Sequence, residues 1–460
     1  MQHTSEQNSL FSSFKDPQFT GKLKAIAIPV ALQNIINFGV NALDTIMLGR
    51  LGEVQLSAAH TSNQLSFMFM ILSGALAAGC GVLAAQYWGR QNVQRVREIV
   101  SFMYRLVAVM SLFFAGVAIF VPHVVLGFII KDAEVVRQGV IYLRVMGIGY
   151  LFTGFTNSTI GILRSTGTVK ISVYVYSSSL FINLFFNYVL IFGKFGFPRL
   201  EVLGAAIATV MARVFEFGFV FVYLFCFDKA IQFKPRHLLH TGEGVAHQFL
   251  IHSSPVLINE IFWTAANFLV GVIIGRMGRE FVAANSISGL MMQFAGIGII
   301  GISSAAGSII GNTIGEGDYD RARHYAKGLM AFSFVVGVVA CGAIQVMRLF
   351  IIDFYNISPM AKEYARQLTM AVSFIVIAMS VSSISMMGTL RGGGDTKFVM
   401  FMDVIFVWII AIPLGAMAGL VWKLPVWMVY VVLKSEDLFK MFVVLYRIPS
   451  GKWLKDVTRQ

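Results

Sequence analysis

Long apolar segments follow one another along most of the 460 residues, and short polar stretches separate them. A helix needs roughly 20 apolar residues to cross the hydrocarbon core of a bilayer. Segments that meet this need begin near residues 26, 57, 99, 134, 171, 203, 248, 283, 325, 363, 398 and 425. They lack the short alternating pattern of barrel strands, so they are helices. The pattern predicts an all-α membrane protein with twelve transmembrane helices.

The first apolar segment carries polar residues at helical spacing, namely Asn34, Asn37, Asn41 and Asp44. Residues three or four apart share one face of a helix. An acid in a membrane helix is costly unless it faces protein, water or an ion, and it is therefore a candidate for function. The alternative is that the amides bond neighbouring helices and that Asp44 caps the end of its helix.

The chain repeats itself after a shift of 226 residues. This shift places Pro29 over Pro255 and Gly89 over Gly315, and a shift of 227 places Arg164 over Arg391. Six helices followed by six in the same order predict two lobes related by a pseudo-two-fold axis along the membrane normal, as in alternating-access transporters. We expect an N-terminal lobe at 1–228, a cytoplasmic linker at 229–247 and a C-terminal lobe at 248–460.

The two lobes differ in their acids, because Asp44 aligns with Val270 and Glu260 aligns with Asn34. Thr264 and Asn267 share one helical face with Glu260. We expect the second acid to meet a cationic substrate, together with the neighbouring polar residues of both lobes, which are Asn34, Asn37, Thr264 and Asn267.

Two further polar stripes lie in the N-terminal lobe. The fifth span holds Ser172, Tyr176, Ser179, Asn183 and Asn187, and the sixth holds Thr209, Arg213 and Glu216. With Asp44 they predict a small hydrated cavity that binds H+ or Na+, since both cations favour oxygen ligands. Helix packing is the alternative for each Asn and Ser. Other charges are expected to be satisfied locally, by the pairs Arg213–Glu216, Glu436–Lys440 and Arg391–Asp395, with Asp403 at the interface.

Composition agrees with a membrane protein, with 57% hydrophobic and 13% charged residues. The net charge is +13, and Lys and Arg are more numerous in the loops on one side of the predicted spans than on the other. This bias favours both termini in the cytoplasm, and the placement of the charge between spans argues against nucleic acid as a partner. Residues 1–20 lack the apolar core of a cleavable signal, so we expect the first helix to target the chain. The three cysteines show no pairing or metal-binding pattern.

The sequence resembles the multidrug and toxic compound extrusion (MATE) family in several motifs and in their order along the chain. The motifs are NALDTIMLGRLG ending at Gly52, NLFFN from Asn183, GAAIATV from Gly204, the paired Leu-Arg loops and RIPSGKW from Arg447. The resemblance implies a cation site of Asp44, Asn183, Asn187 and Thr209, to which we add Asn41. Some members carry an acid in place of Asn187, and another branch pairs the acid at Glu260 with an acid where this chain has Ser380.

The resemblance also implies that, in some members, protonation of the first-helix acid accompanies bending of that helix. Pro29 stands fifteen residues before Asp44 and is the candidate hinge, since proline removes a helical hydrogen bond. A helix-start or packing role for Pro29 is the alternative, because Pro255 recurs without an aligned acid.

These features predict a secondary active efflux antiporter that exports lipophilic or cationic compounds in exchange for H+ or Na+. We expect no cofactor, no metal beyond Na+ at Asp44, a lipid environment, a monomer and a place in the plasma membrane of a prokaryote. A flippase for lipid-linked saccharides is the alternative, although it would need a more cationic cavity. An enzyme is not expected, because no nucleophile and base converge.

Overall fold

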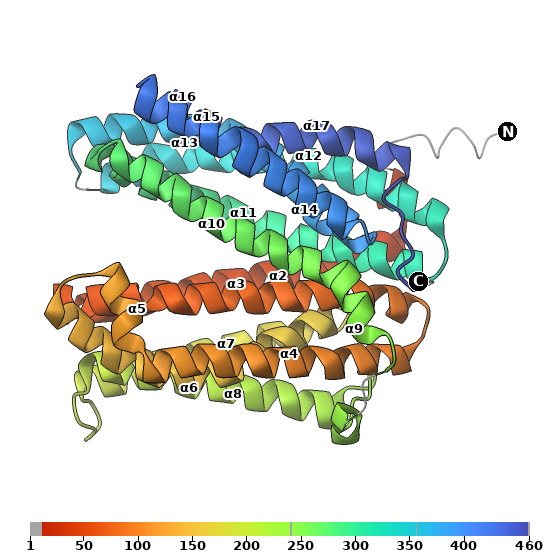
Figure 1. Ribbon diagram of the computed structural model, residues 1–460, viewed down its shortest axis with the longest axis horizontal. Helices are drawn as coiled ribbons and strands as arrows, with labels where there is room; N and C mark the ends of the chain where they lie inside the picture. Colours follow the sequence, from red (N-terminus) through yellow and green to blue (C-terminus); the bar gives the residue numbers. More distant parts are fainter. Residues whose placement is uncertain (1–11, 240–241, 356, 459–460) are drawn as a thin grey trace. The chain divides into compact units, whose positions relative to one another are not determined.

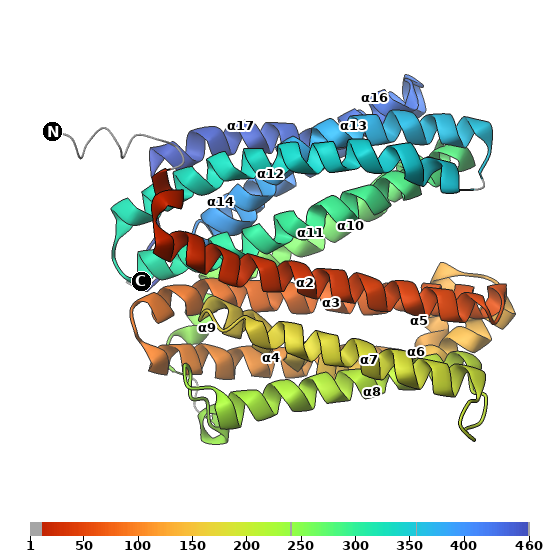
Figure 2. The same cartoon turned by 180° about the vertical axis from the view of Figure 1, so that it is seen from behind.

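The computed structural model describes residues 12–239, 242–355 and 357–458, and all of the described secondary structure is helical. The first half contains Pro17–Gly49 (α2), Glu53–Gly89 (α3), Val93–Phe120 (α4), Pro122–Ile129 (α5), Ala133–Ser165 (α6), Lys170–Phe192 (α7) and Glu201–Val222 (α8). The second half contains Val245–Gln248 (α9), Ser254–Arg276 (α10), Arg279–Gly315 (α11), Tyr319–Phe354 (α12), Pro359–Ser383 (α13), Thr396–Val404 (α14), Ile412–Ala416 (α15), Val426–Leu433 (α16) and Ser435–Ser450 (α17). Short 3-10 turns lie at Ser12–Lys15 and Pro235–Leu239. Figures 1 and 2 show the helices from opposite sides.

The helix starts confirm the internal repeat. The starts of α3, α4, α6 and α7 each lie 226 residues before those of α11, α12, α13 and α14. The side-chain cap of α4 recurs at α12. Asn92 Oδ1 accepts a hydrogen bond from the Arg95 amide at 3.0 Å, and Asp318 Oδ1 accepts one from the Arg321 amide at 3.0 Å. Equivalent caps set the same starts because each satisfies an otherwise unpaired amide of the first turn.

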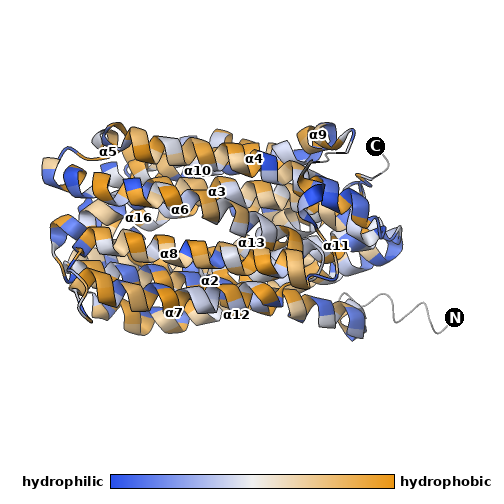
Figure 3. Cartoon of the chain, turned by 90° about the horizontal axis from the view of Figure 1, so that it is seen from below, coloured by the Kyte–Doolittle hydropathy of each residue, from blue (hydrophilic) through white to orange (hydrophobic). Residues whose placement is uncertain are grey.

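Eleven helical segments within the described residues are long and apolar enough to cross a membrane. The twelfth predicted span, near Pro425, is present as α16 and α17 with a break at Lys434. Its charged residues, Lys434, Glu436, Asp437 and Lys440, make it less apolar than the others. Figure 3 shows long apolar stretches along the helices and polar residues gathered towards the loops.

Large apolar side chains remain exposed along the spans. Phe113 and Val339, for example, are 65% and 67% exposed. Extended apolar exposure of this kind is unusual on a soluble monomer and is suited to contact with lipid. Together with the lengths of the spans, it describes a multi-pass membrane protein.

The chain forms two compact units. Unit 1 contains residues 12–31, 85–91 and the described residues from 250 onward; unit 2 contains 32–84 and the described residues of 92–249. This division differs from the predicted lobes in assigning 12–31 and 85–91 to the unit with the C-terminal half. The predicted lobe boundaries therefore stay a prediction, and His240 and Thr241 of the predicted linker lie outside the described residues.

Π-helical turns interrupt several spans, at Tyr223–Phe227, Phe249–Ser253, Ile384–Leu390, Ile405–Ala411 and Met417–Val421. Two of them come directly before a proline in the next helical segment, Pro255 and Pro413. A proline cannot donate a hydrogen bond, and a wider turn can accommodate this loss.

In unit 2, α6 packs between α4 and α8, and α7 packs against α8 (Figure 1). The approach of α8 to α7 is close at Gly204, where a Cβ atom would lie 2.7 Å from the Leu190 carbonyl carbon and oxygen. Small residues permit such backbone contact between membrane helices. The packing brings the polar stripes of α7 and α8 together.

Candidate cation site

A chain of hydrogen bonds joins the first-span acid to polar residues of α7 and α8. Asn187 Nδ2 donates to Asp44 Oδ1 at 2.5 Å and to Asn183 Oδ1 at 2.9 Å. Asn183 Nδ2 in turn donates to Thr209 Oγ1 at 3.4 Å. The structure thus brings Asp44, Asn183, Asn187 and Thr209 together within unit 2.

Helical spacing explains why the α7 amides act together. Asn183 and Asn187 are one turn apart, so their side chains lie on one face of α7 and can bond each other. On α8, the Thr209 hydroxyl donates to the Ala205 carbonyl at 3.0 Å, which leaves its lone pairs to accept from Asn183. Asn183, Asn187 and Thr209 are all buried, and Asp44 is partly buried.

One buried oxygen of this cluster has no hydrogen-bond donor among the described residues. Asn187 Oδ1 is buried and accepts no hydrogen bond from any described residue. Buried polar atoms are normally satisfied, so an unpaired oxygen beside a carboxylate is suited to accept a water molecule or to bind a small cation. A small cation fits this donor set, because Asp44, Asn187 and Thr209 offer carboxylate, amide and hydroxyl oxygens.

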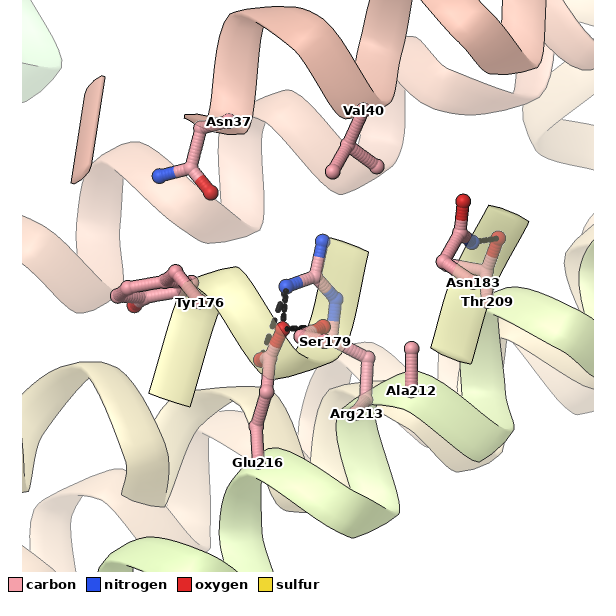
Figure 4. Close-up of a pocket in the computed structure, with 9 residues that line it drawn as sticks. All are labelled: Asn37, Val40, Tyr176, Ser179, Asn183, Thr209, Ala212, Arg213 and Glu216. Atoms are coloured by element: carbon pink, nitrogen blue, oxygen red, sulfur yellow. Dashed lines mark hydrogen bonds and ion pairs between the residues drawn. The ribbon is translucent and has the colours of Figure 1, made fainter. Parts of the chain in front are cut away.

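A small cavity opens next to this cluster, with space for about one water molecule. Its walls come from three helices of unit 2 and are formed by Asn37, Val40, Tyr176, Ser179, Asn183, Thr209, Ala212, Arg213 and Glu216. Figure 4 shows Asn37 and Val40 on one side, with the α7 and α8 residues facing them. The cavity is therefore continuous with the cation-ligand cluster through Asn183 and Thr209.

An ion pair forms part of the cavity wall, and Figure 4 shows it between Tyr176 and Asn183. Arg213 Nη1 lies 2.8 Å and 2.9 Å from the two carboxylate oxygens of Glu216. Ser179 Oγ donates to Glu216 Oε1 at 2.5 Å. The predicted Arg213–Glu216 pair is confirmed. The polar stripes of the fifth and sixth spans predicted a small cavity shared with Asp44, and the structure places Thr209, Arg213 and Glu216 in a cavity wall to which Asp44 does not contribute.

The MatE family model matches residues 29–189 and again residues 255–417. The chain belongs to the MATE family. The two matches begin at Pro29 and Pro255, the prolines that the internal repeat aligns. Members of this family are membrane transporters and not enzymes, and the predicted family and class are confirmed.

The alignments of this MATE protein with curated relatives extend over most of both chains. A probable multidrug resistance protein NorM of Thermotoga maritima is 22% identical, with 97% of each chain aligned. Another NorM, from Agrobacterium fabrum, is 25% identical over 89% of this chain and 88% of its own. The uncharacterized transporter YisQ of Bacillus subtilis is 23% identical over 87% of this chain and 88% of its own.

Solved structures confirm the two-lobe fold. An outward-facing multidrug resistance MATE transporter of the MOP superfamily superposes with a TM-score of 0.84 at 16% identity, covering 94% of this chain and 96% of that one. A MOP superfamily transporter from Pyrococcus furiosus, described as having a binding pocket of reversed polarity, gives a TM-score of 0.83 at 16% identity and the same coverage.

The remaining first-span amides of this MATE protein have different surroundings. Asn37 lines the cavity, and Asn34 is half-buried one turn before it. The Asn41 side chain is exposed, and its backbone carbonyl accepts a hydrogen bond from the Thr45 hydroxyl at 2.7 Å. The structure therefore brings Asn37, and not Asn41, to the cavity wall.

Glu260 lies in unit 1 and is paired with a loop arginine. Arg391 Nη1 is 3.0 Å from Glu260 Oε1, and the two side chains are 8% and 17% exposed. Thr264 and Asn267 donate to carbonyls of their own helix, those of Glu260 and Trp263. Thr264 and Asn267 thus lie on the same helical face as Glu260, but their hydrogen bonds go to the backbone and not to the Glu260 carboxylate.

Two predicted charge pairs are wrong. Arg391 pairs with Glu260, whereas Asp395 pairs with Arg447 at 2.7 Å and Lys455 at 2.5 Å. Lys440 pairs not with Glu436 but with Asp403, at 2.8 Å. The predictions used neighbours along one helix or loop, and these partners come from other segments.

The prediction that Asp403 lies at the membrane interface is also wrong. Its side chain is buried between helices. Asn259 Nδ2 on α10 donates to Asp403 Oδ2 at 2.7 Å, in addition to the contact from Lys440 on α17. A buried carboxylate is stable only with such compensation. The cluster joins three helices of unit 1.

Pro29 lies inside α2, twelve residues after the helix begins at Pro17. It therefore does not start the helix. The division between the compact units falls two residues later, between Ala31 and Leu32, within the same helix. The hinge role of Pro29 stays a prediction.

Proposed function

We propose that this MATE protein is an efflux antiporter that exports lipophilic or cationic compounds from the cytoplasm in exchange for H+ or Na+. Asp44 is the coupling acid, and Asn183, Asn187 and Thr209 are its polar partners. The chain acts as a monomer in the plasma membrane of a prokaryote, with both termini in the cytoplasm.

The observation that carries the proposal is the hydrogen-bonded cluster at Asp44. Asn187 Nδ2 holds one carboxylate oxygen, and its own Oδ1 is buried with no donor among the described residues. An acid with such neighbours can exchange an ion, whereas amides that serve only helix packing would be mutually satisfied. The names of the NorM relatives, probable multidrug resistance proteins, support organic compounds as the exported substrates.

Coupling follows if the ion and the substrate favour different states of the same transporter. An ion that enters from outside neutralises Asp44, and its release inside restores the carboxylate. A ligand shifts an equilibrium only by its different affinity for the two states. The charge change at Asp44 supplies that difference, and Glu260 in unit 1 is the second acid that we assign to substrate recognition.

Export from proteoliposomes tests the proposal. Purified protein is reconstituted, and efflux of ethidium or tetraphenylphosphonium is followed with a pH gradient or a Na+ gradient imposed separately. We expect at least one gradient to drive export above that of protein-free vesicles. Lipid flipping without export of either cation would instead favour the flippase, and export with no gradient would contradict antiport.

A further inference from the structure

We infer that unit 2 holds a binding site for an anionic phospholipid, in a groove between the ends of α2 and α7. The groove has a volume of about 480 Å³. Pockets that bury a drug-sized ligand have volumes of about 300–1,000 Å³. The groove is distinct from the small cavity of Figure 4, because the two have no lining residue in common.

Apolar side chains at helical spacing form the two walls of the groove. One stripe lies on α2 and the other on α7, and together they are Leu43, Ile46, Met47, Leu184, Tyr188 and Phe192. Residues three or four apart share one face of a helix, so each stripe can face the groove along its length. The rings of Tyr188 and Phe192 lie side by side, with centroids 6.1 Å apart.

The groove has a packed floor and an open side. Met47 belongs to the buried apolar core of unit 2, and Leu184 and Phe192 pack against that core. Ile46 and Tyr188, in contrast, are 57% and 45% exposed. An acyl chain can therefore enter from the lipid and lie along the apolar walls.

Two cationic side chains complete the lining of the groove at the ends of the helices. Arg50 follows the last residue of α2, and Lys194 lies two residues after the last residue of α7. The turn that places Lys194 is defined, because Gly193 has a φ of 66° and the Lys194 amide donates to the Val189 carbonyl at 3.0 Å. Both cationic side chains are exposed, and neither forms an ion pair or a hydrogen bond with any residue that the structure describes.

Two cations beside an apolar groove match the two parts of an anionic phospholipid. The Arg50 guanidinium can form paired hydrogen bonds with the phosphate, and Lys194 adds a second positive charge. Tyrosine and basic residues at the ends of spans commonly lie at the level of the head groups. The acyl chain would cover the apolar walls, which a phosphate without a chain would leave uncovered.

The charge of the groove argues against the exported compounds as its ligand. Arg50 and Lys194 would repel the cationic compounds that we propose as substrates. A helix surface that only faces lipid, moreover, has no hollow and accepts neutral and anionic head groups alike. A preference for an anionic head group is therefore the property that the groove predicts.

Lipid binding by the wild-type protein in detergent tests the inference without any export measurement. Palmitoyl-oleoyl phosphatidylglycerol and phosphatidylcholine are added at equal concentration, and the retained lipids are counted by native mass spectrometry. We expect at least threefold more phosphatidylglycerol, which should also raise the unfolding temperature by several degrees more than phosphatidylcholine. Equal retention would overturn the site, and an equal rise in unfolding temperature with glycerol phosphate would assign a soluble anion instead.

Charge variants test the place of the site. Arg50→Gln with Lys194→Gln should reduce the retention of phosphatidylglycerol to that of phosphatidylcholine. The matched control, Lys131→Gln with Arg137→Gln, removes two exposed positive charges from the same unit and should keep the preference. A preference that survives in the first double variant, or is lost equally in both, would overturn the assignment.

Single variants keep the test decisive if the double variant does not fold. Lys194→Gln changes one exposed residue and should lower the preference at least twofold. Ile46→Trp places a larger side chain in the groove without a change of charge, and it should lower the retention of phosphatidylglycerol. Wild-type retention by both single variants would overturn the inference.

Discussion

Asp44 owes its chemical surroundings to helices that are distant in the sequence. Its carboxylate meets Asn187 on α7, which meets Asn183, which meets Thr209 on α8. Each residue alone would be an ordinary polar group in a membrane helix. Together they place a carboxylate beside an unpaired amide oxygen, and this combination is suited to a small cation.

Replacing Asn187 by leucine removes this link and keeps the branched shape of the side chain. Asn187→Leu should reduce ion-driven export at least tenfold, because Asp44 and Asn183 both lose the amide that joins them. Asn41→Leu is the matched change at an exposed amide of α2 and should keep most of the activity. Vesicle export at equal protein density measures both, and equal losses would contradict the site.

Glu260 offers a test that separates stability from recognition. Glu260→Gln leaves the buried Arg391 without its counter-charge, which commonly costs about 3–5 kcal/mol for a buried pair. The double change Glu260→Gln with Arg391→Gln should recover most of the unfolding temperature. Export of cationic compounds should stay reduced in the double variant, and full recovery of export would assign Glu260 a structural role only.

At the scale of elements, the two prolines of the repeat have different surroundings. Pro29 lies inside the continuous helix α2, whereas Pro255 lies inside the helical span Val245–Arg276, directly after the π-helical turn Phe249–Ser253. A proline weakens the interior of a regular α-helix, and a wider turn before it can accommodate the missing hydrogen bond. Pro29 and Pro255 are therefore equivalent in the repeat, but we expect them to affect the stiffness of their helices differently.

Pro29→Ala should restore the missing hydrogen bond to the carbonyl of Ala25 and stiffen α2. If bending of this helix is part of transport, the variant should be at least as stable as the wild type but export several-fold more slowly. Pro255→Ala is the matched control and should change neither quantity much. Unchanged export by Pro29→Ala, measured as initial rates in vesicles, would exclude the hinge.

Helix positions were predictable to a large extent, because apolar runs and the repeat specify them. The caps Asn92 and Asp318 show why, since local side-chain chemistry fixes the starts. The polar stripe of α7 was likewise visible from its spacing. Partners on different helices were not predictable. Arg391 pairs with Glu260, and Lys440 pairs with Asp403, because of how the helices pack, and residue spacing along one helix carries no information about that packing.

The C-terminal residues Asp456 and Val457 belong to a polar cluster within unit 1. Asp456 Oδ2 contacts Arg90 Nη2 at 2.7 Å and accepts a hydrogen bond from the Tyr319 hydroxyl at 2.9 Å. Gln86 joins the same segment, because its Oε1 accepts from the Val457 amide at 2.9 Å. The C-terminal segment thus ties the end of α3 to α12.

Low pH should weaken the contacts that Asp456 makes with Arg90 and Tyr319. Burial alone would raise the pKa of Asp456, but hydrogen bonds from Thr458 and Tyr319 and the charge of Arg90 hold its pKa below the usual value. A lowered pKa in the folded state gives stability that is full above the unfolded pKa of about 4 and is lost as the pH falls through the folded pKa.

Asp456→Asn should therefore lower stability by about 1 kcal/mol at neutral pH, since the pair is partly exposed. The deficit should be constant from pH 8 to pH 5 and shrink below pH 4, where the wild type also becomes protonated. Unfolding temperatures in detergent across this range measure it. A deficit that grows as the pH falls would contradict the assigned direction.

The most direct test of the role of Asp44 is export of tetraphenylphosphonium from proteoliposomes by the wild type and Asp44→Asn, with a pH gradient or a Na+ gradient imposed. The wild type should export faster under at least one gradient, because the ion and the substrate compete through Asp44. Asp44→Asn should fold and reconstitute equally well and should show no gradient-driven export. Equal gradient-driven export by Asp44→Asn and the wild type would show that the coupling acid lies elsewhere.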